Sequence, residues 1–399
     1  MSTQKVIMSI ILVGLLAAAL GCNETHTQKK KAMVEQWEQS TVDAKLPAIE
    51  SMIEQGQLKK AKKALIKCIE VNPDQPQALV LIGRIHAIEG RNDQARQALE
   101  RAIELDPDSD QAWYFLGAMA VLEKDYEYAL EHYQKANDLT PANVDYIIAI
   151  SEIYAETDQA ERAQQAIDRG LLIQPQNLEL MLSKARLCQQ TGRTDEAIRV
   201  YEQARIMHGD IPRVLDPAGY AYISQGQWSK AAEKFDLLIK QYTEDDPHYD
   251  ATMRSLARCL FNANQYAGAL LWYDKLSVIY RDDAEVWMNM AQAALALNDP
   301  KRAAYCANRA VKINPSWSQA YAVLGSAHYM GERYEQSLMA FSKITGDEEL
   351  AGFAWFMSGR CHQQLGRTRQ ANIAFERAEE LDPDNELIMS FMKKTIHPL

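Results

Sequence analysis

A pattern of 34 residues repeats along most of this chain, and it limits the possible folds more than any other feature. Adding 34 to the positions of Ala95 and Pro107 gives Ala129 and Pro141, and the same holds for the other recurring residues. Copies start at 42, 76, 110, 144, 178 and 212 and, after a four-residue insertion, at 250, 284, 318 and 352. A fixed period in this range predicts a solenoid of stacked helix pairs.

The recurring residues belong where two helices cross. Helices approach closely only where neither carries a large side chain, and small residues at positions 8 and 20 of the repeat meet this need. A proline at position 32 ends the second helix, because it has no N–H and clashes with the preceding turn. Position 8 holds Gly83, Gly117, Ser151, Ala185, Gly219, Ala257, Ala291, Gly325 and Gly359. Position 20 holds Ala61, Ala95, Ala129, Ala163, Ala197, Ala231, Ala269, Ala303, Ser337 and Ala371. Position 32 holds Pro73, Pro107, Pro141, Pro175, Pro315 and Pro383.

This pattern resembles the tetratricopeptide repeat over residues 42–385. The resemblance implies an all-α fold, a right-handed α-solenoid of about ten helix hairpins. Repeats one to six would occupy 42–243 and repeats seven to ten 250–385. Residues 386–399 contain Leu387, Ile388 and Phe391 at helical spacing and are predicted to include a capping helix. Arrays of this kind bind many unrelated partners, so the resemblance alone identifies no function.

Two irregular places interrupt the pattern. Asp216-Pro217 in repeat six is predicted to be the N-cap and first residue of a shortened first helix. The insertion falls within residues 241–249. Two interpretations remain open: a hinge between an N-terminal and a C-terminal block, or a superhelix that absorbs both irregularities.

The amino terminus indicates export. Lys5 precedes an apolar run over residues 6–20, which is short for a transmembrane helix and suits a signal peptide over residues 1–21. Ala19-Leu20-Gly21-Cys22 resembles the bacterial lipobox, in which the cysteine receives a diacylglycerol and becomes the new amino terminus. We therefore expect lipidation at Cys22, followed by a tether over residues 22–41. The alternatives are an ordinary cleaved signal with an incidental cysteine, or an uncleaved anchor.

The expected location is the bacterial cell envelope. Asn23 stands where aspartate would be the usual inner-membrane retention signal, which favours the periplasmic face of the outer membrane. A formal net charge of −11 argues against nucleic acid as the main partner.

No constellation of residues indicates catalysis, a metal or a cofactor. The chain has no HExxH, no paired CxxC and no Gly-rich phosphate loop. His86, His328 and His362 all fall at position 11, where the repeat normally has an aromatic residue, and we interpret them as packed side chains. The cysteines after Cys22 lie in distant repeats, so we expect buried thiols and no disulfide framework.

The resemblance implies that a ligand would bind along the first helix of each hairpin, at positions 2, 5, 6, 9, 12 and 13. Arginine gives a planar fork for carboxylates, and aromatic side chains give contact area, so an extended acidic peptide would suit this lining. The alternative is that the arginines pair with acidic neighbours and only hold the stack. The candidate residues are Arg84, Tyr114, Arg186, Tyr220, Arg254, Arg258, Asn289, Tyr329, Phe356 and Arg360.

We therefore expect a non-catalytic scaffold for protein–protein interaction. It would be anchored to the membrane by lipid and recruit partners in envelope assembly, secretion or export. The alternative is a carbohydrate-binding or polymer-guiding module of an exopolysaccharide export system, because aromatic side chains also stack on sugars. An enzyme is the third and weakest hypothesis.

Overall fold

The computed structural model describes residues 30, 31, 33 and 40–383. In this part of the chain there are twenty α-helices between residues 46 and 381, and no β-strand. Consecutive helices pack as hairpins, which confirms the predicted all-α fold. Cys22, the predicted signal peptide, most of the predicted tether and the predicted capping helix lie outside the described residues.

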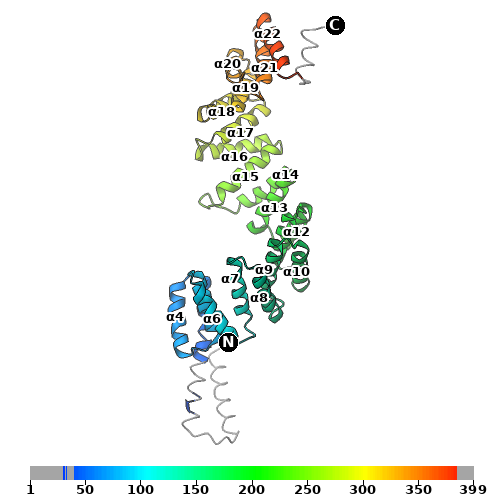
Figure 1. Ribbon diagram of the computed structural model, residues 1–399. Coiled ribbons are helices and arrows are strands. Elements are labelled where there is room, and N and C mark those ends of the chain that lie inside the picture. The colour runs from blue at the N-terminus through cyan, green and yellow to red at the C-terminus, as the bar shows by residue number, and fades with distance from the viewer. Residues whose placement is uncertain (1–29, 32, 34–39, 384–399) are drawn as a thin grey trace. The chain divides into compact units, whose positions relative to one another are not determined.

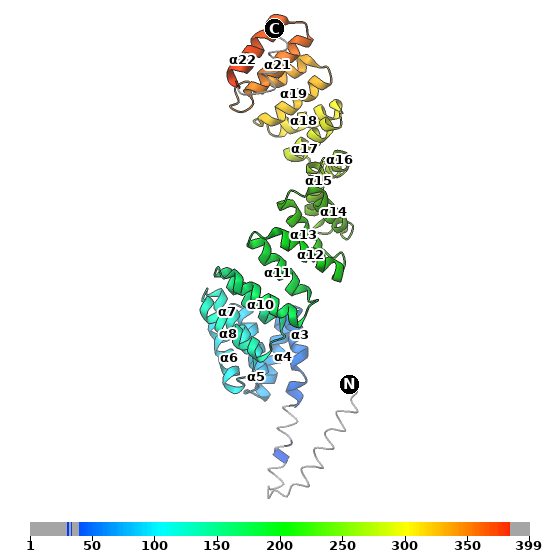
Figure 2. The same ribbon diagram turned by 90° about the vertical axis from the view of Figure 1, so that its right-hand side faces the viewer.

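Two compact units divide the chain, Met1–Pro175 and Gln176–Leu399. In each unit the hairpins follow one another along the chain (Figure 1, Figure 2). The first unit contains α3 (Leu46–Glu54), α4 (Leu58–Val71), α5 (Pro76–Ile88), α6 (Asn92–Leu105), α7 (Asp110–Leu122), α8 (Tyr126–Leu139), α9 (Val144–Glu156) and α10 (Ala160–Ile173). The second contains α11 (Leu178–Gln190), α12 (Thr194–His208), α13 (Pro212–Ser224), α14 (Trp228–Ile239), α15 (Tyr249–Asn262), α16 (Tyr266–Ile279), α17 (Ala284–Ala296), α18 (Pro300–Ile313), α19 (Ser318–Met330), α20 (Tyr334–Phe341), α21 (Ala351–Gln364) and α22 (Thr368–Leu381).

Small residues at position 8 make room for the large side chain at position 24 of the same hairpin. A β-carbon added at Gly359 would lie 2.6 Å from ring carbons of Phe375, and one at Gly219 would lie 2.7 Å from Phe235. Both phenylalanines are fully buried. The glycine therefore lets an aromatic ring fill the crossing point of the two helices.

The turn inside every hairpin uses one left-handed residue at position 15. Five of the ten repeats place glycine there, and the other five hold an L-residue at a positive φ between 57° and 60°. Those residues are Lys124, Asp158, Asn264, Asn298 and Glu332. Because a β-carbon disfavours this conformation, these five turns are strained relative to the glycine turns.

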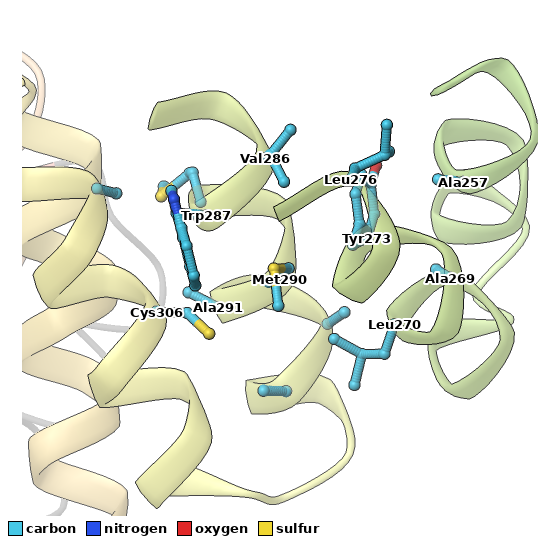
Figure 3. Packing of buried hydrophobic residues seen from close by; sticks show 14 of the residues in the cluster. Ala257, Ala269, Leu270, Tyr273, Leu276, Val286, Trp287, Met290, Ala291 and Cys306 are labelled. Carbon is cyan, nitrogen blue, oxygen red and sulfur yellow. The ribbon is translucent and has the colours of Figure 1, made fainter. Parts of the chain in front are cut away.

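Buried side chains form a series of apolar clusters along the hairpins of each unit. The largest cluster lies in the second unit and runs from α13 to α20. Figure 3 shows part of it, with Tyr273, Leu276, Met290 and Cys306 projecting from successive helices into the space between them. Each hairpin thus buries its apolar face on the next one, as the period predicts.

Repeat six differs from its prediction. Its first helix, α13, begins at Pro212 and has 13 residues, as many as α11, the first helix of repeat five, with Pro217 inside it. The predicted shortened helix is therefore wrong. Pro217 cannot donate a hydrogen bond to the carbonyl of Arg213, but the helix continues because both of its faces pack on neighbouring helices. The insertion forms the connection before α15, where the side-chain amide of Gln241 donates to the Asp210 carbonyl at 2.5 Å.

Candidate binding surface

The predicted ligand-binding residues lie on the first helices of the hairpins. We call positions 2, 5, 6, 9, 12 and 13 of these helices the inner face. Candidates in the first unit lie on α5 and α7, and those in the second unit on α11, α13, α15, α17, α19 and α21. Their surroundings show which of these side chains contact neighbouring repeats and which are exposed to solvent.

In the first unit the two candidates pack against neighbours. The Arg84 guanidinium lies 5.4 Å from the centre of the Phe115 ring, as a cation–π contact requires. Tyr114 is half-buried, with its ring centre 5.4 Å from that of Tyr133 and 5.0 Å from that of Tyr146. Burial raises the pKa of Tyr114, so its hydroxyl stays protonated at neutral pH. These side chains join repeats two, three and four.

Three successive repeats of the second unit place large polar side chains in the open at position 9. Arg186 on α11 and Arg258 on α15 are exposed, and Tyr220 on α13 between them is 48% exposed. The Tyr220 ring packs edge-on against buried Phe235 at 5.3 Å, and its hydroxyl lies 3.3 Å from that of Ser255. Tyr220 therefore presents an oriented phenol on α13, and the first helices of the repeats before and after it carry Arg186 and Arg258.

Arg254 has a structural role. Its Nη1 donates to Asp283 Oδ2 at 2.8 Å, and its guanidinium lies 4.0 Å from the centre of the Tyr280 ring. The Tyr280 hydroxyl donates to Asp250 at 2.6 Å, and Asp283 caps the start of α17. Burial alone would raise the pKa of Asp283, but hydrogen bonds from Arg254 and the helix amides lower it overall. Arg254 thus joins repeat seven to repeat eight.

The remaining candidates, on α17, α19 and α21, take part in separate contacts that each involve an aromatic ring. Asn289 lies beside the phenol of buried Tyr273. The Arg360 guanidinium lies 5.2 Å from the Tyr329 ring centre, across a repeat boundary. The ring of Phe356 lies 5.9 Å from that of Phe375 in the same hairpin.

Position 2 of the inner face carries contacts that sequence reasoning missed. Gln77 donates to Gln111 at 3.1 Å, one repeat further along. In the second unit both Nη atoms of Arg213 donate to the Glu179 carboxylate at 2.5 Å, again one repeat apart. These hydrogen bonds lower the pKa of Glu179. The sequence contains a signal for these contacts, because residues 34 apart occupy the same position in neighbouring repeats.

A second unpredicted feature is a network of charged side chains between repeats five and six. The Lys234 side chain is only 5% exposed and lies 2.8 Å from Glu202 Oε1. Tyr222 donates to the same carboxylate at 3.0 Å, and Arg205 does so at 2.8 Å. Burial works to raise the pKa of Glu202, but these hydrogen bonds outweigh it and the pKa is lowered. The sequence signal is a lysine at position 23, where the other repeats have mostly small or apolar residues.

The position-11 histidines each precede an arginine by five residues. Arg91 Nε donates to His86 Nδ1 at 2.9 Å, and Arg333 and Arg367 stand in the same place relative to His328 and His362. Burial lowers the pKa of all three histidines, and the arginine charge lowers it further. They are therefore neutral, half-buried side chains at physiological pH.

The thiols in the described part of the chain are buried and unpaired. Burial raises the pKa of Cys259 and Cys306 to about 11, and also raises that of Cys68, Cys188 and Cys361. A protonated, buried thiol is a poor nucleophile. Among the same residues no group of three or more His, Cys, Asp or Glu side chains has the arrangement that a metal needs.

An open hollow of about 790 Å³ lies beside the Arg254 contacts, at the start of repeat eight. Residues 279–285 line one part of it, and Ile313, Asn314 and Trp317 line the rest. It lies where one hairpin connects to the next, away from position 9 of the inner face.

These features define the class of the protein: an α-helical repeat scaffold for protein–protein interaction. Profiles of the tetratricopeptide repeat match residues 43–119, 120–179 and 222–293, and further profiles of the same repeat match 180–208, 284–317 and 354–385. The chain belongs to the tetratricopeptide repeat family. In the described part, no helix has the length and apolar character needed to cross a bilayer.

Similarity to individual proteins is distant. Anaphase-promoting complex subunit 3 of Schizosaccharomyces pombe is 24% identical over 49% of this chain and 29% of its own length. The TPR repeat-containing protein YpiA of Bacillus subtilis is 21% identical over 58% of this chain and 54% of its own. The chain thus spans about half or less of these relatives. Among solved structures, Pseudomonas aeruginosa pilF has a TM-score of 0.44 and 17% identity, covering 54% of this chain and 98% of that one.

Proposed function

We propose that this protein is a non-catalytic scaffold of the bacterial cell envelope that binds acidic segments of partner proteins on its inner face. The observation that carries the proposal is the exposed set at position 9 of three successive repeats, Arg186, Tyr220 and Arg258. Helix packing does not require these residue types, since position 9 is Ala118 in repeat three and Ser326 in repeat nine. We call this set the position-9 site.

The chemistry of the site fits a peptide with carboxylate groups. A guanidinium holds a carboxylate through two parallel N–H donors, and this geometry is stronger than a single neutral hydrogen bond. Tyr220 adds a broad apolar ring whose orientation Phe235 already fixes, so little side-chain entropy is lost on binding. Arginine and tyrosine are also the residues that most often dominate binding energies at protein interfaces.

A charge reversal tests the site. The full chain carrying Arg186→Glu and Arg258→Glu is crosslinked in native membranes, and its partners are compared with those of the wild type. Arg199→Glu is the matched control, because Arg199 is an exposed arginine on α12, the second helix of repeat five. We expect the double variant to give at least about tenfold less crosslinked partner than the wild type, and the control to give the same amount as the wild type. Retention of every partner would refute the proposal.

Binding of a polysaccharide, lost in the same variants, would favour the carbohydrate-binding alternative over a protein partner. Exposed Tyr220 is the residue that would stack on a sugar ring. Purified polysaccharide from the same membranes, offered to both variants, separates these two outcomes.

We also propose that lipid on Cys22 anchors the protein, with the periplasmic face of the outer membrane as its location. The support is the sequence Ala19-Leu20-Gly21-Cys22 after an apolar run, and the envelope role in assembly, secretion or export follows from this location. Cys22→Ala should release the protein from membranes, and globomycin should block maturation of the wild type only. A membrane-bound, globomycin-insensitive Cys22→Ala product would contradict the anchor.

A further inference from the structure

Asp216 on α13 is a charged residue with no partner in the described part of the chain. It occupies position 5 of repeat six on the inner face, one helical turn before Tyr220, so both side chains lie on the same side of the helix. Because α13 begins at Pro212, Asp216 does not cap the helix. Asp216 is half-buried, but its carboxylate oxygens are not sealed from solvent.

Helix packing does not account for a carboxylate at this position. Eight of the other nine repeats place an apolar or aromatic side chain at position 5, as Leu182 does in repeat five. The ninth has Arg254, whose charge is paired with Asp283 at 2.8 Å. Burial raises the pKa of Asp216, and the charge of His248 opposes this only in part. Asp216 is therefore a partly desolvated charge without compensation, which is typical of a binding site.

Pro217 adds a second hydrogen-bond acceptor to the same part of α13. In a regular helix the amide of residue 217 would donate to the carbonyl of Arg213, but proline has no N–H. Positions 2 and 6 both belong to the inner face, so the carbonyl that lacks its helix amide also lies there. Between Arg186 on α11 and Arg258 on α15, α13 therefore offers two acceptors, which suit a donor and not an anion.

The insertion before α15 places an aromatic ring and a second carboxylate near Asp216. Burial raises the pKa of the Tyr242 phenol, and the charges of Asp216 and Asp246 raise it further, so both carboxylates act on this side chain. The ring centre of Tyr242 lies 5.9 Å from that of His248, whose amide donates to Asp246 at 2.8 Å. An aromatic ring beside carboxylates suits a cation. Only this boundary between repeats has inserted residues, so the combination occurs once in the array.

We infer that Asp216 binds a lysine or arginine side chain of the partner segment, between the carboxylates that Arg186 and Arg258 hold. The inference rests on the proposed function and specifies its ligand further, as a segment that is acidic at both ends and basic in the middle. The ammonium or guanidinium donates to the Asp216 carboxylate and to the Arg213 carbonyl. A wholly acidic segment is repelled by Asp216.

The spacing of the helices determines the spacing of the charges in the segment. First helices of successive repeats are on the order of 10 Å apart, and an extended chain advances about 3.3–3.6 Å per residue. Residues about three apart in the segment therefore meet successive first helices. Asp216 lies about 6 Å along α13 from Tyr220, a distance that a long basic side chain spans. The expected motif is an acidic residue, a basic residue about three positions later, and an acidic residue about three positions after that.

Synthetic peptides test the inference with the full chain in detergent. One has the sequence glutamate–glycine–serine–lysine–glycine–serine–glutamate, with both ends capped, and a second has norleucine in place of lysine. Fluorescence anisotropy should show that the wild type binds the lysine peptide about five- to tenfold more tightly. Asp216→Asn should bind both peptides equally, and Asp216→Lys should prefer a third peptide with glutamate at the centre. Glu376→Gln is the matched control, because Glu376 is an exposed acid on α22, and it should keep the wild-type preference.

The stability of the free protein separates a binding role from a structural one. Asp216→Leu introduces the residue that repeat five has at the same position, Leu182. Because the substitution removes a desolvated charge that has no partner, it should not lower the urea midpoint, although it should abolish the preference for lysine. A lower midpoint would assign Asp216 to the fold instead.

The natural segment is identified by photocrosslinking in the cells that make the protein. Benzoylphenylalanine replaces Tyr220 in the full chain, and the crosslinked peptides are sequenced by mass spectrometry. We expect one segment with a basic residue between two acidic residues. A captured segment without this basic residue would contradict the inference.

The peptide experiment distinguishes failure of this inference from failure of the proposed function. Equal binding of the two peptides by the wild type, lost in the Arg186→Glu and Arg258→Glu double variant, would overturn the inference and leave the proposed function standing. Binding that the double variant retains would refute the proposed function itself. Absence of measurable binding to the wild type would overturn both.

Discussion

Neutralising Glu202 should destabilise repeats five and six much more than removing Lys234, its buried partner. The Lys234 side chain is 5% exposed, whereas Glu202 is 25% exposed and also bonds Arg205 and Tyr222. Glu202→Gln therefore leaves a buried ammonium whose other carboxylate, Glu233, lies 3.6 Å away and is 63% exposed. Breaking a buried ion pair in this way costs about 3–5 kcal/mol.

Lys234→Met removes the buried charge itself. Glu202 keeps Arg205 and Tyr222 as partners, and methionine fills most of the space of the lysine stem, so the expected cost is about 1 kcal/mol or less. The double variant should be more stable than Glu202→Gln alone, because it no longer buries an unpaired cation. If the double variant is more stable than Glu202→Gln, the cost of Glu202→Gln comes from the buried, unpaired Lys234 ammonium. If it is less stable, the cost comes from lost contacts.

Hydrogen exchange measured by mass spectrometry on peptides from α12, α13 and α14 gives the free energy of local opening in the full chain. Urea titration followed by circular dichroism gives an independent ranking of the three variants. Equal losses for the two single variants, or a double variant less stable than Glu202→Gln, would refute the reasoning. Losses of less than about 1 kcal/mol in both would show that water reaches Lys234.

Three further changes probe single features of the fold. Gly359→Ala should destabilise the last hairpin by about 1–3 kcal/mol, because the new methyl group meets the Phe375 ring at 2.6 Å; unchanged exchange in α21 and α22 would contradict this. Glu332→Gly should stabilise the α19–α20 hairpin by up to about 1 kcal/mol by relieving its positive φ, and slower unfolding checks it. His328 has a pKa lowered by burial and by Arg333, so its stabilising effect is present above about pH 6.5 and is lost as the pH falls below that value. His328→Phe should flatten the stability profile between pH 7 and 5 by up to about 1.4 kcal/mol per pH unit, and a profile parallel to the wild type would count against it.

Sequence alone predicts the hairpins because their requirements recur in every copy. Gly359 and Phe375 illustrate this: the small residue and the ring that covers it lie at fixed positions, so the period identifies both. Pro217 shows where a local rule fails. A proline is a good first residue of a helix, but Pro212 already takes that place in α13, and packing on both sides carries the helix past Pro217.

The candidate site was only partly predictable. The period predicts that Arg186, Arg254 and Arg258 lie on first helices, but it does not identify the side chains that they contact. Arg254 is held by Asp283, and that contact depends on which residue stands at the end of the same repeat as the N-cap of α17. The Lys234–Glu202 pair escaped prediction for the same reason, since its partners lie 32 residues apart at different positions of neighbouring repeats.

In the part of the chain that the structure describes, each helix packs mainly against the next helices along the chain, so a hairpin depends chiefly on its near neighbours. In evolutionary terms, a gene for such a chain can lengthen by duplicating 102 nucleotides, because the new copy meets the same neighbours as the old one. After duplication, the residues where two helices cross are constrained by the side chains packed around them, whereas exposed residues can change more freely.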